Sequence, residues 1–163
     1  MTKTRITLQN SAQKVQDFLN SNGYDCTVFE LPGSTRTAQE AAEAIGCLVA
    51  QIAKSLVFKN RANGEPVLVI ASGANRVDIK KIKQSIGLRL GKADGIFVKE
   101  RTGFAIGGIP PVCHTTSLQT ILDPDLKNHE AIWAAAGTPR SLFKLNPLDL
   151  EAMTGGIWLD IAE

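Results

Sequence analysis

Two features of the chain have residue types and spacing that could support catalysis. Lys54 precedes a mostly apolar stretch, so its ammonium group either reaches back to water or stands at the mouth of a pocket, where it would bind a phosphate or a polarised carbonyl. The second feature is the loop 107–111, with the sequence GGIPP, in which glycines permit close backbone approach and prolines stiffen the exit. Rigid backbone N–H groups can hold a carbonyl oxygen without a catalytic side chain, although a tight turn would have the same composition.

Other reactive side chains are scarce. Cys113 and His114 are adjacent, and neighbours in an extended segment point to opposite faces, so they do not form a nucleophile–base pair. His129 lies in a polar turn and is expected to be solvated. The chain contains no G-x-S-x-G motif and no glycine-rich nucleotide-binding motif. With Cys26 and Cys47, the cysteines number three and form no C-x-x-C pair, which predicts neither disulfides nor zinc; we expect no metal and no cofactor.

A basic segment is the third candidate. Lys80, Lys81 and Lys83 follow one another on a predicted helix, in a chain whose formal net charge is only +2. Such a run is usually a solvated helix surface. It could also follow a nucleic-acid backbone, in which case binding would weaken with salt.

Length and composition indicate the class of protein that must position these groups. The chain has 163 residues, of which 44% are hydrophobic and 21% charged, and it lacks repeats and linkers, so we expect one domain over residues 1–163. Apolar runs are short compared with the roughly 20 residues of a membrane-spanning helix. Residues 1–6 lack the apolar core of a secretory signal, so we expect a cytoplasmic protein without a membrane partner.

Apolar periodicity and turn residues predict alternating helices and strands. Ser11, Thr37, Asp78 and Asn146 are expected helix caps, and Asn63-Gly64 is typical of a β-hairpin turn. We expect helices near 11–22, 37–45, 78–86, 93–100 and 146–154, and strands near 27–31, 54–59, 67–71, 104–106, 120–122, 131–135, 142–145 and 157–161. Because a hairpin argues against a purely parallel arrangement, this pattern predicts an α/β (α+β) fold with a mixed, strongly curved sheet surrounded by helices.

Three segments are familiar in order and spacing: 37–42 (TAQEAA), 51–58 (QIAKSLVF) and 103–111 (GFAIGGIPP). Shorter matches at 121–123 and 135–137 continue to the segment 150–160. Together these segments resemble the YbaK/prolyl-tRNA-editing-domain family over nearly the whole chain. The resemblance implies a largely antiparallel, barrel-like core and a freestanding deacylase that acts in trans. Its substrate would be the ester of a mischarged aminoacyl-tRNA, and an aminoacyl-tRNA synthetase is a further possible partner.

The resemblance also assigns roles to individual residues. Lys54 falls on the family's functional lysine, which would contact the terminal adenosine or its phosphate. Gly107 and Pro111 fall on the G-x-x-x-P loop, whose backbone would hold the aminoacyl carbonyl. Gly108 and Ile109 lie inside that loop, and we assign Gly108 to the catalytic groups with Lys54 and Gly107.

Further positions are expected to contact the substrate. Asp123 and Gly137 match family positions near the pocket, and Ser55 and His114 are assigned to substrate binding with Ile109 and Pro111. Cys47 and Ile52 are expected to line the pocket. Where cysteinyl-specific members look like Gly-Gln, this chain has Cys113-His114, so a cysteinyl substrate is less expected.

The chemistry needs no protein base. An aminoacyl ester is activated, so positioning water and stabilising the developing oxyanion can suffice, and the ribose hydroxyl beside the ester could orient that water. Esters of alanine, serine, threonine, proline and cysteine all remain open as substrates, as does the oligomeric state. The alternative is a non-catalytic module that binds tRNA or single-stranded nucleic acid through its lysines.

Overall fold

A long β-hairpin forms the centre of the sheet, as the two apolar segments around Asn63-Gly64 predict. In the computed structural model, which describes residues 8–35 and 37–163, β2 (Ile52–Asn60) pairs antiparallel with β3 (Pro66–Ser72). Gly64 has a φ of 75° in the connecting turn, a backbone conformation that favours glycine. All seven residues of β3 are buried, so this hairpin lies at the core of the described chain.

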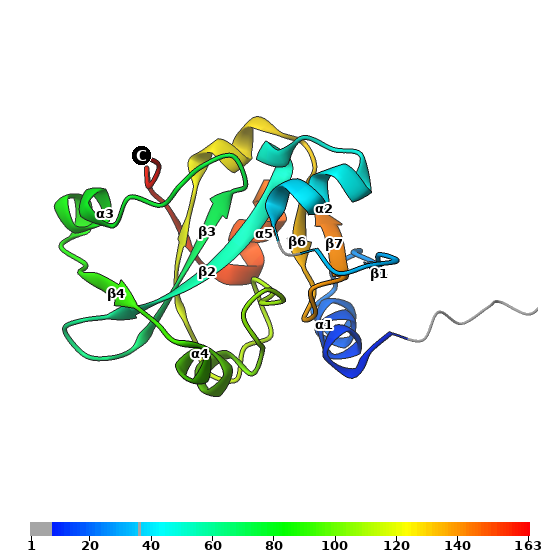
Figure 1. Ribbon diagram of the computed structural model, residues 1–163, viewed down its shortest axis with the longest axis horizontal. Coiled ribbons are helices and arrows are strands. Elements are labelled where there is room, and N and C mark those ends of the chain that lie inside the picture. Colours follow the sequence, from blue (N-terminus) through cyan, green and yellow to red (C-terminus); the bar gives the residue numbers. More distant parts are fainter. Residues whose placement is uncertain (1–7, 36) are drawn as a thin grey trace, which may run out of the picture.

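Further strands extend the hairpin on both sides into a curved eight-stranded sheet of the described residues (Figure 1). Its order is β1-β7-β6-β2-β3-β5-β8, and β4 pairs with β2. The remaining strands are β1 (Val28–Glu30), β4 (Leu90–Lys92), β5 (Gln119–Leu122), β6 (Ile132–Ala135), β7 (Ser141–Leu145) and β8 (Ile157–Trp158). The pairs β2–β6, β3–β5 and β5–β8 are parallel and the others antiparallel, which confirms the predicted mixed sheet.

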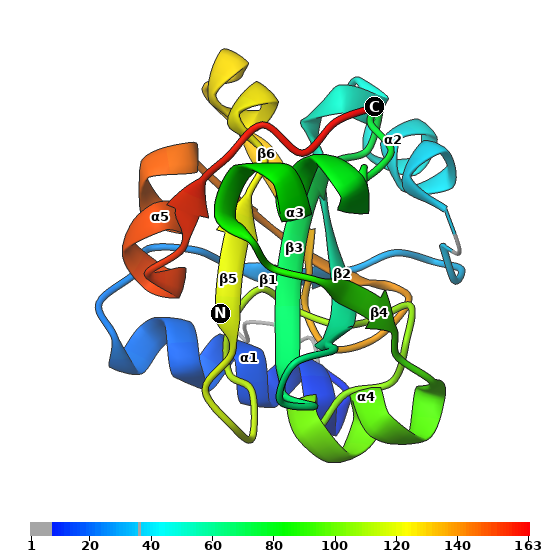
Figure 2. The same cartoon turned by 90° about the vertical axis from the view of Figure 1, so that its left-hand side faces the viewer.

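Helices pack on both faces of the hairpin. They are α1 (Asn10–Ser21), α2 (Ala38–Ile45), α3 (Ile79–Ile86), α4 (Gly95–Thr102) and α5 (Pro147–Thr154), with the short 3-10 helices η1 (Val49–Gln51) and η2 (Pro124–Asn128). Figure 2 shows α3 in front of β3, and Figure 1 shows α3 and α2 on opposite sides of the molecule. In the part of the chain that the structure describes, no helix is both long and apolar enough to cross a membrane.

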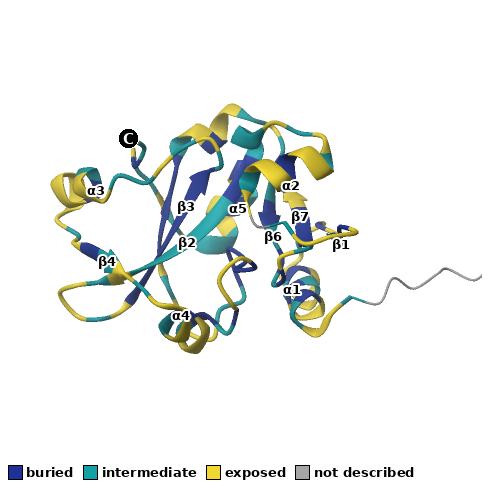
Figure 3. Cartoon of the chain, in the orientation of Figure 1, coloured by how far each residue is buried: buried dark blue, intermediate teal, exposed yellow. Residues whose placement is uncertain are grey.

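The core has two main clusters, because successive side chains of a strand point to opposite faces. Leu68 and Ile70 of β3 pack in one cluster with Leu19 of α1 and Leu150 of α5. Val67, Val69 and Ala71 of β3 pack in the other with Ile82 of α3. Figure 3 shows the buried residues along β3 and β6. Each fully buried Leu or Ile contributes about 1.5–3 kcal/mol relative to an exposed one.

Most of the predicted helix caps are confirmed. Thr37 accepts a hydrogen bond from the Glu40 N–H, Asp78 caps α3, and Asn146 caps α5. The prediction for Ser11 is wrong: α1 begins directly after Gln9, so Ser11 lies inside its first turn. A serine can serve at either place, and the apolar periodicity alone does not distinguish them.

Three segments differ from the sequence-based expectation. Residues 104–106 do not form a strand, because Thr102 Oγ1 accepts the Phe104 N–H and turns the chain. The short strand β4 was not predicted; it is held by pairing with β2 rather than by a pattern of its own. β8 ends at Trp158, earlier than expected, and the chain continues with an isolated bridge between Val77 and Ala162.

Candidate active site

A cavity of about 750 Å³ lies along β2 and is bounded by α2, the 106–109 loop and the strands β6 and β7. Its volume falls within the range of about 300–1,000 Å³ typical of small-molecule sites. The lining residues used below are Thr37, Ile52, Lys54, Ser55, Leu56, Val57, Phe58, Val98, Ile106, Gly107, Ile109, Ala135 and Leu142. The cavity therefore brings together two features that are more than 50 positions apart in the sequence, Lys54 and the glycine-rich loop.

Lys54 supplies the positive charge of this cavity. Among the lining residues that the structure describes, it is the one ionisable side chain, and it is half-buried in β2. Burial lowers the pKa of its ammonium group below the ordinary lysine value, nearby Arg76 lowers it further, and the carboxylate of Asp123 acts in the opposite direction. An ammonium that has lost part of its hydration interacts more strongly with an anion or a polarised carbonyl than a fully solvated one would.

The two glycines of the loop have different structural roles. Gly107 is exposed, has a φ of 99° and lines the cavity together with Ile109. Gly108 is buried: its N–H donates to the Ala105 carbonyl at 3.2 Å, and its own carbonyl accepts the Gly137 N–H at 2.9 Å. A Cβ on Gly108 would lie 2.8 Å from backbone atoms of Thr138. Gly108 and Gly137 therefore fasten the loop to the β6–β7 turn, and neither is among the described lining residues.

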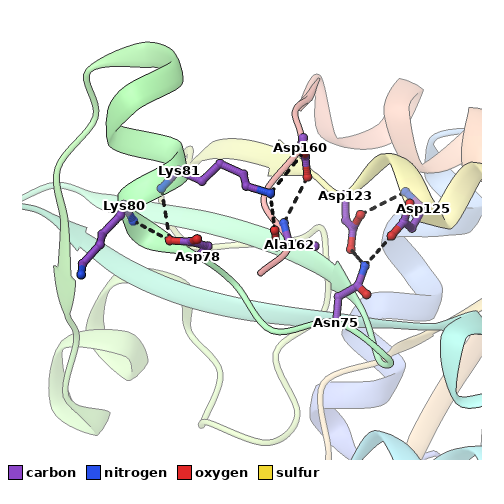
Figure 4. Close-up of polar contacts among 8 residues, drawn as sticks. All are labelled: Asn75, Asp78, Lys80, Lys81, Asp123, Asp125, Asp160 and Ala162. Carbon is purple, nitrogen blue, oxygen red and sulfur yellow. Dashed lines mark hydrogen bonds and ion pairs between the residues drawn. The ribbon is translucent and has the colours of Figure 1, made fainter.

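Asp123 organises the end of the strands rather than the cavity wall. Its buried carboxylate accepts hydrogen bonds from the Ser72 N–H at 3.0 Å, from Asn75 Nδ2 at 2.8 Å and from the Asp125 N–H at 3.0 Å. Figure 4 shows the carboxylate between Asn75 and Asp125. Its link to the site is electrostatic, through its effect on the pKa of Lys54.

Pro111 and His114 line a second, smaller cavity of about 320 Å³, which also includes Cys113. His114 Nε2 lies 2.7 Å from the Pro110 carbonyl, which assigns the proton to Nε2. Burial lowers the pKa of His114, the Lys14 charge lowers it further, and the Pro110 hydrogen bond acts in the opposite direction. His114 thus holds the proline end of the loop from outside the larger cavity.

The burial of His114 makes the stability of the fold depend on pH, because burial lowers the pKa of its imidazole. The unfolded chain binds a proton at His114 near the ordinary pKa of about 6.5, and the folded protein binds it only at lower pH. The contribution of His114 to the free energy of unfolding is therefore fully present above about pH 6.5. It is lost as the pH falls from there to the lowered pKa of the folded protein. In urea unfolding at pH 7 and pH 5, we expect His114→Gln, which keeps a donor but does not titrate, to lose less stability than the wild type. Parallel losses in the two proteins would contradict a lowered pKa of His114 in the folded protein.

The basic helix lies apart from the cavity. Lys81 Nζ pairs with the Asp160 carboxylate at 3.3 Å and donates to the Ala162 carbonyl (Figure 4). Lys80 and Lys83 are exposed. Of the described lining residues of the cavity, none belongs to α3. Lys81 is thus already engaged in fixing the end of the chain.

Several lining positions are absent from the sequence-based list. Ile106 and Leu56 flank predicted residues, so their neighbourhood was visible in the sequence, but Val98 and Leu142 come from distant elements. Ile52 lines the cavity as predicted, while Cys47 packs beside it without lining the cavity. The described residues also contain no group of three or more His, Cys, Asp or Glu side chains that could hold a metal.

Comparison with known proteins decides the family of this site. The model of the aminoacyl-tRNA editing domain matches residues 33–153. The chain belongs to this family. The match includes β2, the glycine-rich loop and α2, so the whole wall of the cavity lies within the editing domain.

Similar proteins share most of the length of this chain. A crystal structure described as that of "a putative trans-editing enzyme for prolyl tRNA synthetase" is 47% identical, has a TM-score of 0.91, and covers 96% of this chain and 99% of its own. The Bacillus subtilis protein YwhH is 32% identical over 140 residues, which are 85% of this chain and 87% of YwhH. In Enterococcus faecalis, the "Putative Cys-tRNA(Pro)/Cys-tRNA(Cys) deacylase EbsC" is 27% identical over 128 residues, covering 77% of this chain and 76% of EbsC. The predicted family and fold are confirmed.

Proposed function

We propose that this protein is a trans-acting deacylase that hydrolyses the ester between a small amino acid and the terminal adenosine of a mischarged tRNA in the cytoplasm. The observation that carries this proposal is that Lys54, Gly107 and Ile109 line one cavity of about 750 Å³ in an editing domain. Its partners are aminoacylated tRNA and, as the source of that tRNA, an aminoacyl-tRNA synthetase. The similarity to a structure described as a trans-editing enzyme supports the same conclusion.

Each group has a defined part in the reaction. The Lys54 ammonium binds the terminal adenosine or its phosphate and so fixes the ester at the loop. Neither the Gly107 N–H nor the Ile109 N–H donates to another described residue, so both can donate to the ester carbonyl oxygen. Gly108, Gly137, Pro111 and His114 keep this loop in place, and Asp123 tunes the charge of Lys54.

Hydrolysis then follows from positioning. A water molecule, oriented by the free ribose hydroxyl beside the ester, attacks the carbonyl carbon, and the oxygen of the resulting tetrahedral intermediate is held by the loop donors. The bond between the carbonyl carbon and the ribose oxygen breaks. The proton lost by the water is transferred to that ribose oxygen, which releases the amino acid and an uncharged tRNA. A protein base is not required in this sequence of steps.

The exposed lysines of α3 serve a different part of the substrate. A tRNA is much larger than the cavity, so we expect the exposed Lys80 and Lys83 to contact its phosphates away from the acceptor end. Lys81 contributes less, because its ammonium is already paired with Asp160. This assignment keeps catalysis and RNA binding on separate elements.

The test is a panel of tRNAs carrying alanine, serine, threonine, proline or cysteine, incubated with catalytic amounts of protein. We expect many turnovers on at least one ester, and binding without turnover would support the non-catalytic module instead. A second arm uses the preferred substrate without the free hydroxyl on its terminal ribose. Its turnover should fall by at least about 100-fold, because the attacking water would lose the group that orients it, while its affinity stays within about threefold. Unchanged turnover would refute the role of the hydroxyl.

A further inference from the structure

The edge of β2 that faces the cavity is open. β6 pairs with β2 only at Ile52 and Ala53, and β4 pairs with it only from Phe58 to Asn60. Both partners lie on the side of β2 opposite β3. The strand therefore lacks a neighbour along residues 54–57, between its two partners on that side, and these four residues line the cavity.

The hydrogen-bond pattern identifies which main-chain groups face this gap. In an antiparallel pair, alternate residues direct both their N–H and their C=O toward the partner strand. The Ile52 carbonyl accepts from Gly73 and the Asn60 N–H donates to Glu65, so the even-numbered residues of β2 bond to β3. On the opposite edge, the Arg61 N–H donates to the Arg89 carbonyl beyond the end of β4, which places the odd-numbered residues on that side. Ser55 and Val57 consequently direct their N–H and C=O groups into the gap.

These groups lack partners among the residues that the structure describes. No backbone or side-chain hydrogen bond of the described chain involves the outward N–H or C=O of Ser55 or Val57. The hydroxyl of Ser55 is also buried and has no partner among the described residues. Buried polar groups are nearly always paired, so an unpaired set beside a cavity indicates a ligand that completes it. The cavity lies against this edge of β2, so consecutive residues of the strand line it although their side chains point to opposite faces of the sheet.

We propose that the aminoacyl group of the substrate binds to the open edge of β2 as a strand one residue long, paired with Ser55. This inference rests on the proposed function and specifies how its substrate is recognised. The α-amino group donates to the Ser55 carbonyl and Oγ, and the ester carbonyl accepts from the Ser55 N–H. These are the two main-chain bonds that one residue exchanges with its neighbour in a narrow antiparallel pair.

The surroundings fit such a residue-sized strand. The described lining contains no carboxylate, so carbonyl and hydroxyl oxygens are the acceptors available to the amino group. The ester carbonyl would then lie between the Ser55 N–H and the donors of the loop, the two sides from which an oxyanion can be held. The side chain of the amino acid meets apolar walls, which include Leu56, Val98, Ile106 and Leu142. The edge would thus recognise any α-amino acid, and the walls would discriminate between side chains.

The first experiment removes the amino group from the substrate. The ester that is hydrolysed fastest in the panel is compared with its deamino counterpart, which for alanine is the propionyl ester on the same tRNA. Both rates are divided by the uncatalysed rates, because the amino group also activates the ester. We expect kcat/KM to be at least about 50-fold lower for the deamino ester, since the Ser55 acceptors would then be left unpaired. Equal normalised values would overturn the proposal.

The second experiment removes one hydrogen-bonding group of the protein at a time. Ser55→Ala removes Oγ, and Ser55→lactic acid additionally replaces the N–H by an ester oxygen, so the pair differs in one main-chain donor. We expect Ser55→Ala to lower the preference for the aminoacyl over the deamino ester, and Ser55→lactic acid to lower kcat/KM by a further factor of about ten. Val28→α-hydroxyisovaleric acid, which removes an N–H that donates to Gln16 Oε1 outside the cavity, is the control and should retain wild-type kcat/KM. Identical kinetics of the two Ser55 variants would refute the pairing.

A binding measurement separates this inference from the proposed function. Adenosine that carries alanine through a stable 3′-amide is compared with its propionyl-amide counterpart by calorimetry. Tighter binding of the alanyl compound, lost in Ser55→Ala, would support the strand pairing even if every ester in the panel proved inert. Equal affinities would overturn the pairing, whether or not the protein hydrolyses tRNA esters.

Discussion

Lys54→Met is expected to lower deacylation by at least about 100-fold in kcat/KM, with no loss of thermal stability. The lysine is the one ionisable side chain in the described lining of the cavity, and methionine has a similar length without the charge. Removing one preorganised electrostatic contact from an active site costs about 10²–10³ in rate. Steady-state kinetics on the preferred ester, together with a thermal melt, measures both quantities.

The stability half of this expectation follows from the direction of the pKa shift. Burial lowers the pKa of Lys54, so its charged form costs folding free energy at neutral pH. That cost is present below the lowered pKa and is relieved as the pH rises through it toward the ordinary lysine value of about 10.4. Methionine removes the cost at every pH, so Tm should stay equal or rise. A lower Tm would show that the ammonium stabilises the fold.

A matched control is Lys144→Met. Lys144 is exposed on β7, where its ammonium lies 5.6 Å from the ring centre of Trp133, and it does not line the cavity. The substitution makes the same change of net charge on another strand, and kcat/KM should stay within about twofold. If both variants lost activity equally, net charge rather than the position of Lys54 would explain the effect.

Gly137→Ala is expected to destabilise the protein by about 2–6 kcal/mol and to reduce deacylation as well. Gly137 has a φ of 98°, and a Cβ there would lie 2.7 Å from the Ser11 carbonyl oxygen of α1. Backbone strain of this kind costs about 1–3 kcal/mol and overpacking a similar amount. Activity should fall because the Gly137 N–H holds the Gly108 carbonyl and so positions the loop. Urea unfolding and steady-state kinetics on the same samples measure the two effects.

Gly23→Ala separates strain from steric overlap. Gly23 follows α1 with a φ of 78°, and a Cβ there would meet nothing within 4 Å. Its substitution should lower the free energy of unfolding by only about 1–2 kcal/mol of backbone strain and leave the reaction rate unchanged. Equal destabilisation of the two variants would mean that α1 shifts to make room for the extra methyl group at no further cost. The steric overlap at Gly137 would then not explain a loss of activity.

The helices and strands that could be predicted are those marked by turn and cap residues close to them in the sequence. The hairpin at Asn63-Gly64 and the caps at Thr37, Asp78 and Asn146 depend on nearby residues, and the structure contains them. β4 depends instead on its partner β2, and residues 104–106 are turned by the Thr102 side chain. Neither effect leaves a periodic pattern in the chain.

In the candidate site, too, features with a local sequence signal were predictable and features that depend on distant segments were not. Lys54 and the glycine-rich loop were visible because each has an unusual local composition, and both line the cavity. The open edge at Ser55 was not visible as such, because it exists only where β6 and β4 end along β2. Likewise, the bond from Gly137 to Gly108 joins segments that the sequence separates by 29 positions.

In the proposed reaction the loop supplies backbone N–H groups as hydrogen-bond donors, whereas side chains such as Ile106 contribute only to the wall of the cavity. Backbone N–H groups remain after almost any substitution, so changes at Ile106, Leu142 or Val98 would reshape the proposed space for the amino acid and leave the proposed donors in place. Single substitutions at these positions would then be enough to change which amino acid the protein accepts. Inactivation, in contrast, requires damage at a few sites, such as the glycines that hold the loop in position.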